Sequence, residues 1–123
     1  MFNNMMKTIL ATAVLSSALT LCAVFSFGFA VLPSEIKLDN KRVKVTTVTY
    51  APGVPRDRFI RQADQVIVFL DDCKYERKDS QTGEKTIRER KSGDIIWHDK
   101  GEDAPVLTNL GAKPYRTLTI ELK

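Results

Sequence analysis

Histidine is almost absent from this sequence of 123 residues, since His98 is the only one. Transition-metal sites in proteins bring several imidazole or carboxylate ligands into one space. A chain with a single histidine therefore does not favour a metal centre, and we predict neither a metal nor another cofactor. A site made of carboxylates alone, from Asp57, Asp64 and Asp103, stays open as an alternative.

Cysteine is also scarce, and the two thiols belong to Cys22 and Cys73. If the N-terminal segment is removed, Cys73 has no partner, so an intrachain disulfide is excluded even in an oxidising compartment. We interpret Cys73 as a half-buried strand residue. A redox nucleophile is the alternative, but it would lack a resolving cysteine.

The N-terminal part of the chain lacks charge, with no charged residue between Lys7 and Glu35. One basic residue, a long apolar stretch and small residues at its end are typical of a secretory signal peptide. We predict a signal peptide over residues 1–30, cleaved after Ala30, and a periplasmic or secreted mature domain over residues 31–123. The apolar stretch is also long enough for an uncleaved membrane anchor, which stays open as the alternative.

The predicted mature domain has no strong excess of charge. It keeps all 15 acidic residues and loses only Lys7 of the 19 basic ones, which leaves a net charge of +3. The basic residues are mixed with acidic ones and are typical of solvated strand faces. We therefore predict no nucleic-acid partner, and a membrane contact only through residues 1–30 if these are not cleaved.

Beyond Pro33 the sequence shows no long amphipathic helix and instead follows a period of two residues. Segments 42–50 and 115–122 alternate between two faces and are rich in β-branched residues, as strands are. Segment 65–70 is a short apolar run that is typical of a buried strand, and 95–98 predicts a further strand. A short strand and a turn follow in "VLTNLGAKP".

The charged segment 73–90 predicts a hairpin, with arms at 73–78 and 85–90 and a turn near 81–83. Because both arms are strongly charged, we expect this hairpin to be an exposed edge. Six or more short strands separated by Gly and Pro indicate an all-β fold, an antiparallel sandwich or barrel.

The order of motifs in the second half of the chain is specific. A Gly-Asp pair, apolar strand residues, a loop glycine, Asn-x-Gly and a closing strand follow one another. The residues concerned are Gly93-Asp94-Ile95-Ile96-Trp97-His98, Gly101, Asn109-Leu110-Gly111 and Pro114. From about Val43 to Lys123 the chain thus resembles the cupin superfamily in its small single-domain form. The resemblance implies a small antiparallel jelly-roll barrel with a central cavity.

The same resemblance implies four metal ligands that this chain lacks. The first cupin motif is a Gly, five residues, His-x-His and then a Glu. Counting from Gly53 places the two histidines at Phe59 and Arg61 and the glutamate at or near Gln65. The histidine of the second motif falls near Asp103. Phe cannot ligate a metal and Arg repels a cation, so we expect a metal-free barrel with degenerate metal-binding motifs.

Phe59 and Arg61 are two residues apart, so on one strand they share a face that the resemblance directs into the barrel. An apolar ring beside a guanidinium suits a small anion with an apolar body, such as a small carboxylate or a sugar acid. We predict Phe59, Arg61, Gln65 and Trp97 as ligand-binding residues. Arg56 and Arg58 are then expected on the outer face or in the loop, in contact with solvent. In the alternative, Phe59 fills the cavity and Arg61 pairs with an inward acid.

These observations favour an exported, metal-free small-molecule binding or accessory protein over an enzyme. One alternative is a metal-independent isomerase or epimerase, with His98, Tyr50 or Tyr115 carrying a proton. Another is a structural barrel that forms a homodimer, which an exposed apolar stripe from Val43, Val45 or Ile120 would support. Dimers are common among cupin relatives.

Overall fold

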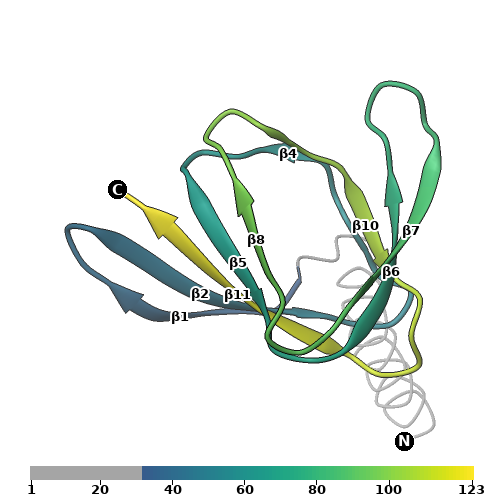
Figure 1. Ribbon diagram of the computed structural model, residues 1–123, viewed down its shortest axis with the longest axis horizontal. Helices are drawn as coiled ribbons and strands as arrows, with labels where there is room; N and C mark the ends of the chain where they lie inside the picture. Colours follow the sequence, from purple (N-terminus) through teal and green to yellow (C-terminus); the bar gives the residue numbers. More distant parts are fainter. Residues whose placement is uncertain (1–31) are drawn as a thin grey trace, which may run out of the picture. The chain divides into compact units, whose positions relative to one another are not determined.

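The computed structural model describes residues 32–123, which form eleven strands and no helix (Figure 1). The strands are β1 (Ser34–Asp39), β2 (Val43–Tyr50), β3 (Pro55–Arg56), β4 (Phe59–Ile60), β5 (Gln65–Phe69), β6 (Cys73–Lys78), β7 (Lys85–Arg90), β8 (Ile95–His98), β9 (Asp103–Ala104), β10 (Val106–Asn109) and β11 (Tyr115–Leu122). These residues contain no helix of the length and apolarity that crossing a membrane requires. The all-β prediction is confirmed for them, whereas the predicted signal peptide lies outside the described residues.

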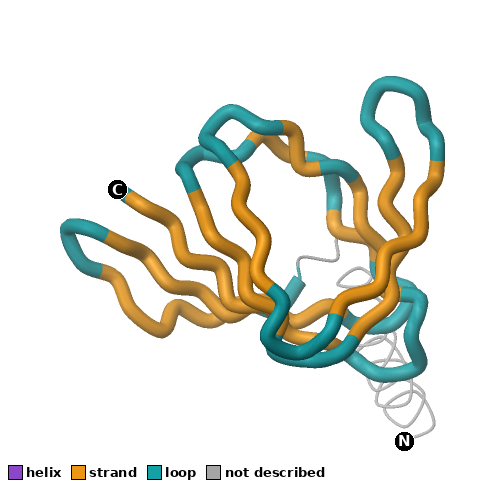
Figure 2. Tube along the Cα trace, in the orientation of Figure 1, coloured by secondary structure: helices purple, strands orange, loops and turns teal. Residues whose placement is uncertain are grey.

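Two main sheets face each other across a central space (Figure 2). The five-stranded sheet has the order β1-β2-β11-β5-β8, and the four-stranded sheet has the order β3-β10-β6-β7. The short strands β4 and β9 pair only with each other. The paired strands in both main sheets are antiparallel, as a jelly-roll barrel requires.

The space between the sheets holds a cluster of aromatic rings. Tyr115 of β11 lies opposite Tyr50 of β2, and their stacked rings have centroids 4.7 Å apart. Phe69 of β5 stacks with Tyr75 of β6 at 6.2 Å. These four residues make up most of the buried apolar core. Because Tyr75 comes from the four-stranded sheet, the cluster joins the two sheets.

The opposite face of the five-stranded sheet is apolar as well. One row of directly paired residues crosses all five strands, and its members are Leu38, Val45, Ile120, Val66 and Trp97. The next row contains Leu118, Val68 and Ile95. We call these eight residues the outer apolar stripe. Its ends are well exposed, because Leu38, Ile95 and Trp97 are all among the exposed large hydrophobic residues.

The period-two pattern predicted β2, β5, β8, β10 and β11 close to their observed positions, and it predicted the hairpin of β6 and β7. The hairpin ends the four-stranded sheet, because β7 pairs with β6 alone. The sequence did not predict β1. That strand contains only two apolar residues, Ile36 and Leu38, which are too few for a period of two to mark it, and all six of its residues are exposed.

Candidate functional site

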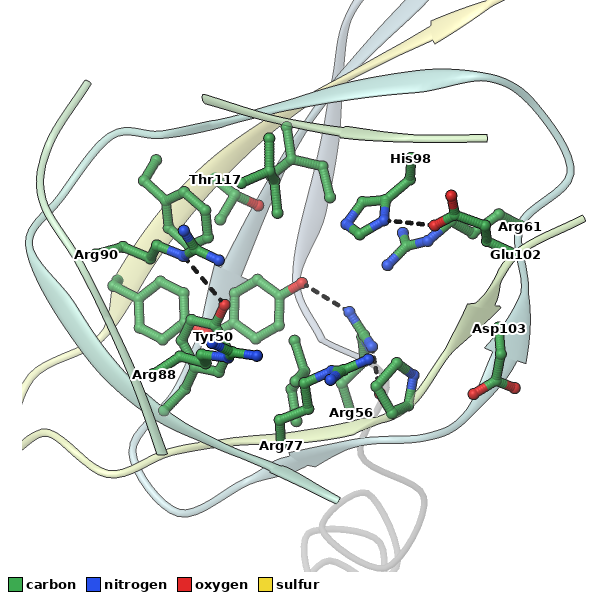
Figure 3. A pocket seen from close by; sticks show the side chains of 17 residues that line it. Tyr50, Arg56, Arg61, Arg77, Arg88, Arg90, His98, Glu102, Asp103 and Thr117 are labelled. Carbon is green, nitrogen blue, oxygen red and sulfur yellow. Dashed lines mark hydrogen bonds and ion pairs between the residues drawn. The ribbon is translucent and has the colours of Figure 1, made fainter. Parts of the chain in front are cut away.

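A cavity of about 310 Å³ lies between the two main sheets (Figure 3). Small-molecule pockets in proteins begin at about this size. The cavity combines an aromatic surface with arginine side chains, and these arginines are Arg56, Arg61, Arg77, Arg88 and Arg90. So many cationic groups around one small cavity make it a candidate site for an anion.

The four-stranded sheet supplies most of these charges from its inner face. Arg88 of β7 lies opposite Tyr75 of β6, whose ring is in the core, and so it shares the inward face. Arg77 and Arg90 are two residues away from Tyr75 and Arg88, so they face the same way. Arg56 of β3 lies on the same face, because Leu107 of β10 pairs with Arg56 on one side and with Arg77 on the other. The remaining arginine follows β4.

None of the five arginines forms an ion pair with a carboxylate. The ion pairs within residues 32–123, which include every Asp and Glu of the chain, all involve other cations. The two acids that line the cavity are already bound. Glu102 contacts His98, and Asp103 accepts hydrogen bonds from Arg58 and Ser80. Glu102 raises the pKa of Arg61 through its charge without forming an ion pair with it, and the other four arginines have no paired carboxylate, so most of the positive charge of the cavity lacks a counter-charge.

Arg61 is the most buried of the five, with 4 % of its surface exposed. Its backbone is fixed, because its N–H donates to the Glu102 carbonyl at 2.9 Å and its carbonyl accepts from Gly101 at 2.8 Å. Among the described residues its Nε has no partner. Desolvation lowers the pKa of the guanidinium, and the charge of Arg56 lowers it further. A buried guanidinium of this kind destabilises the folded protein unless a ligand or a water molecule accepts its hydrogen bonds.

The prediction that Arg61 points into the barrel is therefore confirmed, since it lines the cavity. The alternative, in which Arg61 pairs with an inward acid, is wrong for the described residues. Sequence reasoning could not settle this point, because the partner of a buried charge comes from segments that are distant along the chain.

Phe59 does not point into the cavity, and 43 % of its surface is exposed. The expected orientation is wrong because β4 pairs with β9 and joins neither main sheet. The Phe59 ring instead contacts two cavity arginines, with its centroid 5.1 Å from Cζ of Arg56 and 5.7 Å from Cζ of Arg61. Phe59 therefore supports the charged groups by cation–π contacts rather than lining the site.

Arg56 lines the cavity, and its predicted position on the outer face is wrong. Its Nη1 donates to the Tyr50 hydroxyl at 3.4 Å, and its Nη2 donates to the Pro105 carbonyl. Its Nε is buried without a partner among the described residues. The pairing of β3 with β10 causes the difference, because it places Arg56 beside Leu107, which packs against the core.

His98 projects into the same cavity (Figure 3). Its Nδ1 lies 2.8 Å from Oε2 of Glu102. Because a carboxylate only accepts hydrogen bonds, Nδ1 carries the proton and Nε2 of the neutral ring keeps its lone pair. Burial lowers the pKa of His98 below its ordinary value, although the hydrogen bond to Glu102 opposes this. The imidazole is therefore neutral at neutral pH.

Like Phe59, the predicted ligand-binding residues Trp97 and Gln65 are not among those that line the cavity. Trp97 is 50 % exposed, and its indole N–H donates to Oδ1 of Asp99 at 2.8 Å. Its predicted place in the cavity wall is wrong because β8 directs Ile96 and His98 inward and Trp97 outward. Gln65 is buried at the start of β5, opposite His98, but does not reach the cavity.

The remaining wall of the cavity is neutral and aromatic. Burial raises the pKa of Tyr115, so its hydroxyl stays protonated. The Tyr75 hydroxyl accepts a hydrogen bond from Nε of Arg90 at 3.4 Å.

Burial also raises the pKa of Cys73 to about 11, so its thiol is protonated at neutral pH and is not an activated nucleophile.

The positions at which the resemblance implies metal ligands do not fit a metal. A Phe59 ring and an Arg61 guanidinium offer no ligand atom, and Asp103 is engaged by Arg58. Within residues 32–123, no group of three His, Cys, Asp or Glu side chains could hold a metal ion. A buried positive charge at Arg61 would also repel a cation. The donors present suit an anion.

Sequence reasoning missed Arg77, Arg88 and Arg90, because the charged hairpin was interpreted as a solvated edge. The available signal was the alternation of Arg77 with Tyr75, which share one face of β6. An aromatic residue in a charged strand marks the inward face, and the arginines on that face then point to the cavity.

No family model matches the sequence, and no curated protein matches it. Several solved structures are similar to this chain in fold. A cupin domain from Bordetella pertussis Tohama I has a TM-score of 0.67 and 20 % identity, covering 75 % of this chain and 93 % of that chain. The polyketide cyclase RemF from Streptomyces resistomycificus has a TM-score of 0.59 and 15 % identity, covering 72 % and 63 % of the two chains.

The DMSP lyase DddQ from Ruegeria pomeroyi DSS-3 has a TM-score of 0.57 and 14 % identity, covering 75 % of this chain and 47 % of that chain. Similarity at these identities concerns the fold. The similar structures include enzymes and an uncharacterized conserved protein from Klebsiella pneumoniae, so the fold does not select one activity.

Proposed function

We propose that this domain, which has the fold of the cupin domains, binds a small anionic molecule in the cavity of its barrel. One observation carries the proposal: five arginines line the cavity and none has a carboxylate partner among the described residues, which include every acid of the chain. The buried Arg61 is the principal anchor.

The chemistry of the cavity narrows the ligand class. A guanidinium offers its donors in a planar fork that matches the two oxygens of a carboxylate. The tyrosine rings beside the arginines provide an apolar surface for the body of the ligand. A small carboxylate or a sugar acid combines both features.

The proposal is tested by calorimetric titration of the purified protein with succinate, gluconate and galacturonate. We expect at least one of these anions to bind, and Arg61→Gln to weaken its binding by about tenfold or more, because a hydrogen-bonded charge pair is worth that much. Arg42→Gln is the matched control, since Arg42 is exposed and does not line the cavity. Binding that is equal in both variants would refute Arg61 as the anchor.

A second candidate is a metal-independent isomerase or epimerase, and the position of His98 favours it. His98 lines the cavity, Glu102 holds its ring, and its lowered pKa leaves a neutral base at neutral pH. Incubation with galacturonate in D₂O would reveal such an activity as deuterium incorporated at carbon. The exchange should disappear in His98→Gln, and its absence in the native protein would leave a binding protein.

We propose in addition that the domain is exported. The sequence of residues 1–30 supports this, because one basic residue and a long uncharged apolar stretch precede the first acid, Glu35. Intact-mass measurement of the protein from the cell envelope or medium should show a chain that begins at Val31. A full-length mass in that fraction would instead support an uncleaved anchor.

A further inference from the structure

We propose that the ligand is a dianion and that the cavity holds its two acidic groups at two separate arginine pairs. The first anion site consists of Arg56 and Arg61, and the second consists of Arg88 and Arg90. This inference rests on the proposed function and specifies the class of ligand, a molecule with an acidic group at each end of a short body.

The first anion site is built by the segment from β3 to the loop after β4. Both guanidinium groups lie over the ring of Phe59 and each has a buried Nε without a partner among the described residues. Arg56 is fixed by hydrogen bonds to the Tyr50 hydroxyl and the Pro105 carbonyl. Two guanidinium groups therefore lie close together and repel each other. A bound anion would reduce this repulsion.

The second anion site is built by β7. Arg88 and Arg90 are two residues apart and face the cavity, opposite Tyr75 and Cys73 of β6. Arg90 is fixed by its hydrogen bond to the Tyr75 hydroxyl and by a cation–π contact of 5.6 Å with Phe69. No carboxylate of the described residues forms an ion pair with either arginine.

A row of tyrosines separates the two sites. Arg56 bonds the hydroxyl of Tyr50, the Tyr50 ring stacks on Tyr115 at 4.7 Å, and the Tyr115 ring lies 6.2 Å from that of Tyr75. The Tyr75 hydroxyl in turn bonds Arg90. Figure 3 shows Arg61 and Arg90 on opposite sides of the cavity.

Because the aromatic row lies between the two arginine pairs, we expect a single carboxylate to contact one pair only. A monoanion at the first site would leave the second pair, in which Arg90 is half-buried and Arg88 is exposed, without a counter-charge at the cavity. A dianion satisfies both pairs, and its body lies along the tyrosine rings. The cavity volume of about 310 Å³ limits that body to a few carbon atoms or one sugar ring.

Titration of the purified protein with butyrate, succinate, glutarate and adipate tests the proposal, because these acids differ in charge and in the spacing of the carboxylates. We expect one of the three dicarboxylates to bind at least about tenfold more tightly than butyrate. Arg88→Gln should remove most of that advantage, so that the dicarboxylate binds this variant about as weakly as butyrate does. Arg61→Gln should weaken the binding of both.

Arg88 is suited to this test because its side chain is exposed and its replacement leaves the core intact. Lys85→Gln, on the same strand but outside the cavity, is the matched control. If butyrate and the dicarboxylates bind equally and Arg88→Gln changes neither, the two-site proposal is overturned, while the sensitivity to Arg61→Gln keeps the proposed function. If neither these acids nor gluconate and galacturonate bind, both are overturned.

Discussion

Arg61 keeps a charged guanidinium where only 4 % of its surface meets solvent. Burying a charge without a partner destabilises a protein, and binding sites commonly retain such groups at the expense of stability. We predict that Arg61→Met raises the free energy of unfolding of the ligand-free protein by about 1 kcal/mol, because Met occupies similar space without the charge.

Urea unfolding in a buffer of low anion concentration measures this effect. Arg42→Met is the control, since an exposed arginine of this kind should change stability by less than about 0.5 kcal/mol. A lower stability of Arg61→Met would mean that the guanidinium supports the fold rather than a ligand.

His98 reports on the charge of the cavity, because it is the only imidazole of the chain and gives one set of NMR signals. Burial lowers its pKa below the ordinary 6.5, and the charges of Arg61 and Arg56 act in the same direction. We predict that a saturating dicarboxylate raises the pKa of His98, because the bound anion offsets the arginine charges. An unchanged NMR titration curve would place the anion away from Arg61.

The same imidazole makes stability depend on pH. The unfolded chain binds a proton at His98 near pH 6.5, whereas the folded protein binds it only at lower pH. The free energy of unfolding should therefore fall as the pH drops from about 6.5 through the folded pKa, and it should be constant with respect to this group above pH 6.5. His98→Gln should flatten that part of the curve in thermal melts at a series of pH values.

At the scale of elements, Asn109 fastens the end of β10 to its neighbours. It is 2 % exposed, and its Nδ2 donates to the carbonyls of Tyr50 and Lys113 at 2.9 Å each. Its Oδ1 accepts from the Gly111 N–H at 2.8 Å. The Asn-x-Gly motif is thus a strand-end brace, in which one side chain replaces backbone partners for three groups.

We predict that Asn109→Ala lowers the free energy of unfolding by about 2–3 kcal/mol, since buried backbone groups lose their partners. Asn109→Asp keeps the acceptor for Gly111 and loses both donors, so it should also destabilise the fold. Chemical denaturation of the two variants measures the effect. A change below about 0.5 kcal/mol in Asn109→Ala would show that water replaces the side chain at no cost.

The strands were predictable because alternation of β-branched residues is a local property, visible in β2 and β11 without knowledge of their partners. The inward face was not predictable in the same way. Alternation defines two faces of β3 or β8, but only the pairing with a distant strand decides which one meets the cavity. That is why Arg61 was assigned correctly while Arg56 and Trp97 were placed on the wrong sides.

At the scale of the whole molecule, the outer apolar stripe is an apolar surface whose contact with water is unfavourable. A row of five apolar side chains crosses the sheet, with Leu38 and Trp97 exposed at its ends and the three between them half-buried, and apolar patches of this kind are uncommon on monomers. We propose a second copy of this domain as its partner, because two identical sheets can bury the same stripe around a two-fold axis.

We predict that Trp97→Glu shifts the protein from dimer to monomer in sedimentation velocity, because a carboxylate at one end of a buried apolar contact has no partner. Ile87→Glu is the control, since Ile87 is an exposed apolar residue of the other sheet. A native protein that sediments as a monomer at high concentration would exclude the dimer.

The edge position of β7 has a consequence for motion. This strand has one neighbour, β6, yet it carries Arg88 and Arg90 of the second anion site. Edge strands separate from their sheet more readily than central strands do. The second anion site is therefore carried by a strand that separates readily. A ligand bound by both arginine pairs would link β7 to the β3–β4 segment. Amide hydrogen exchange in β7 should then slow on binding, and the opening of this hairpin would set the rate at which the ligand escapes.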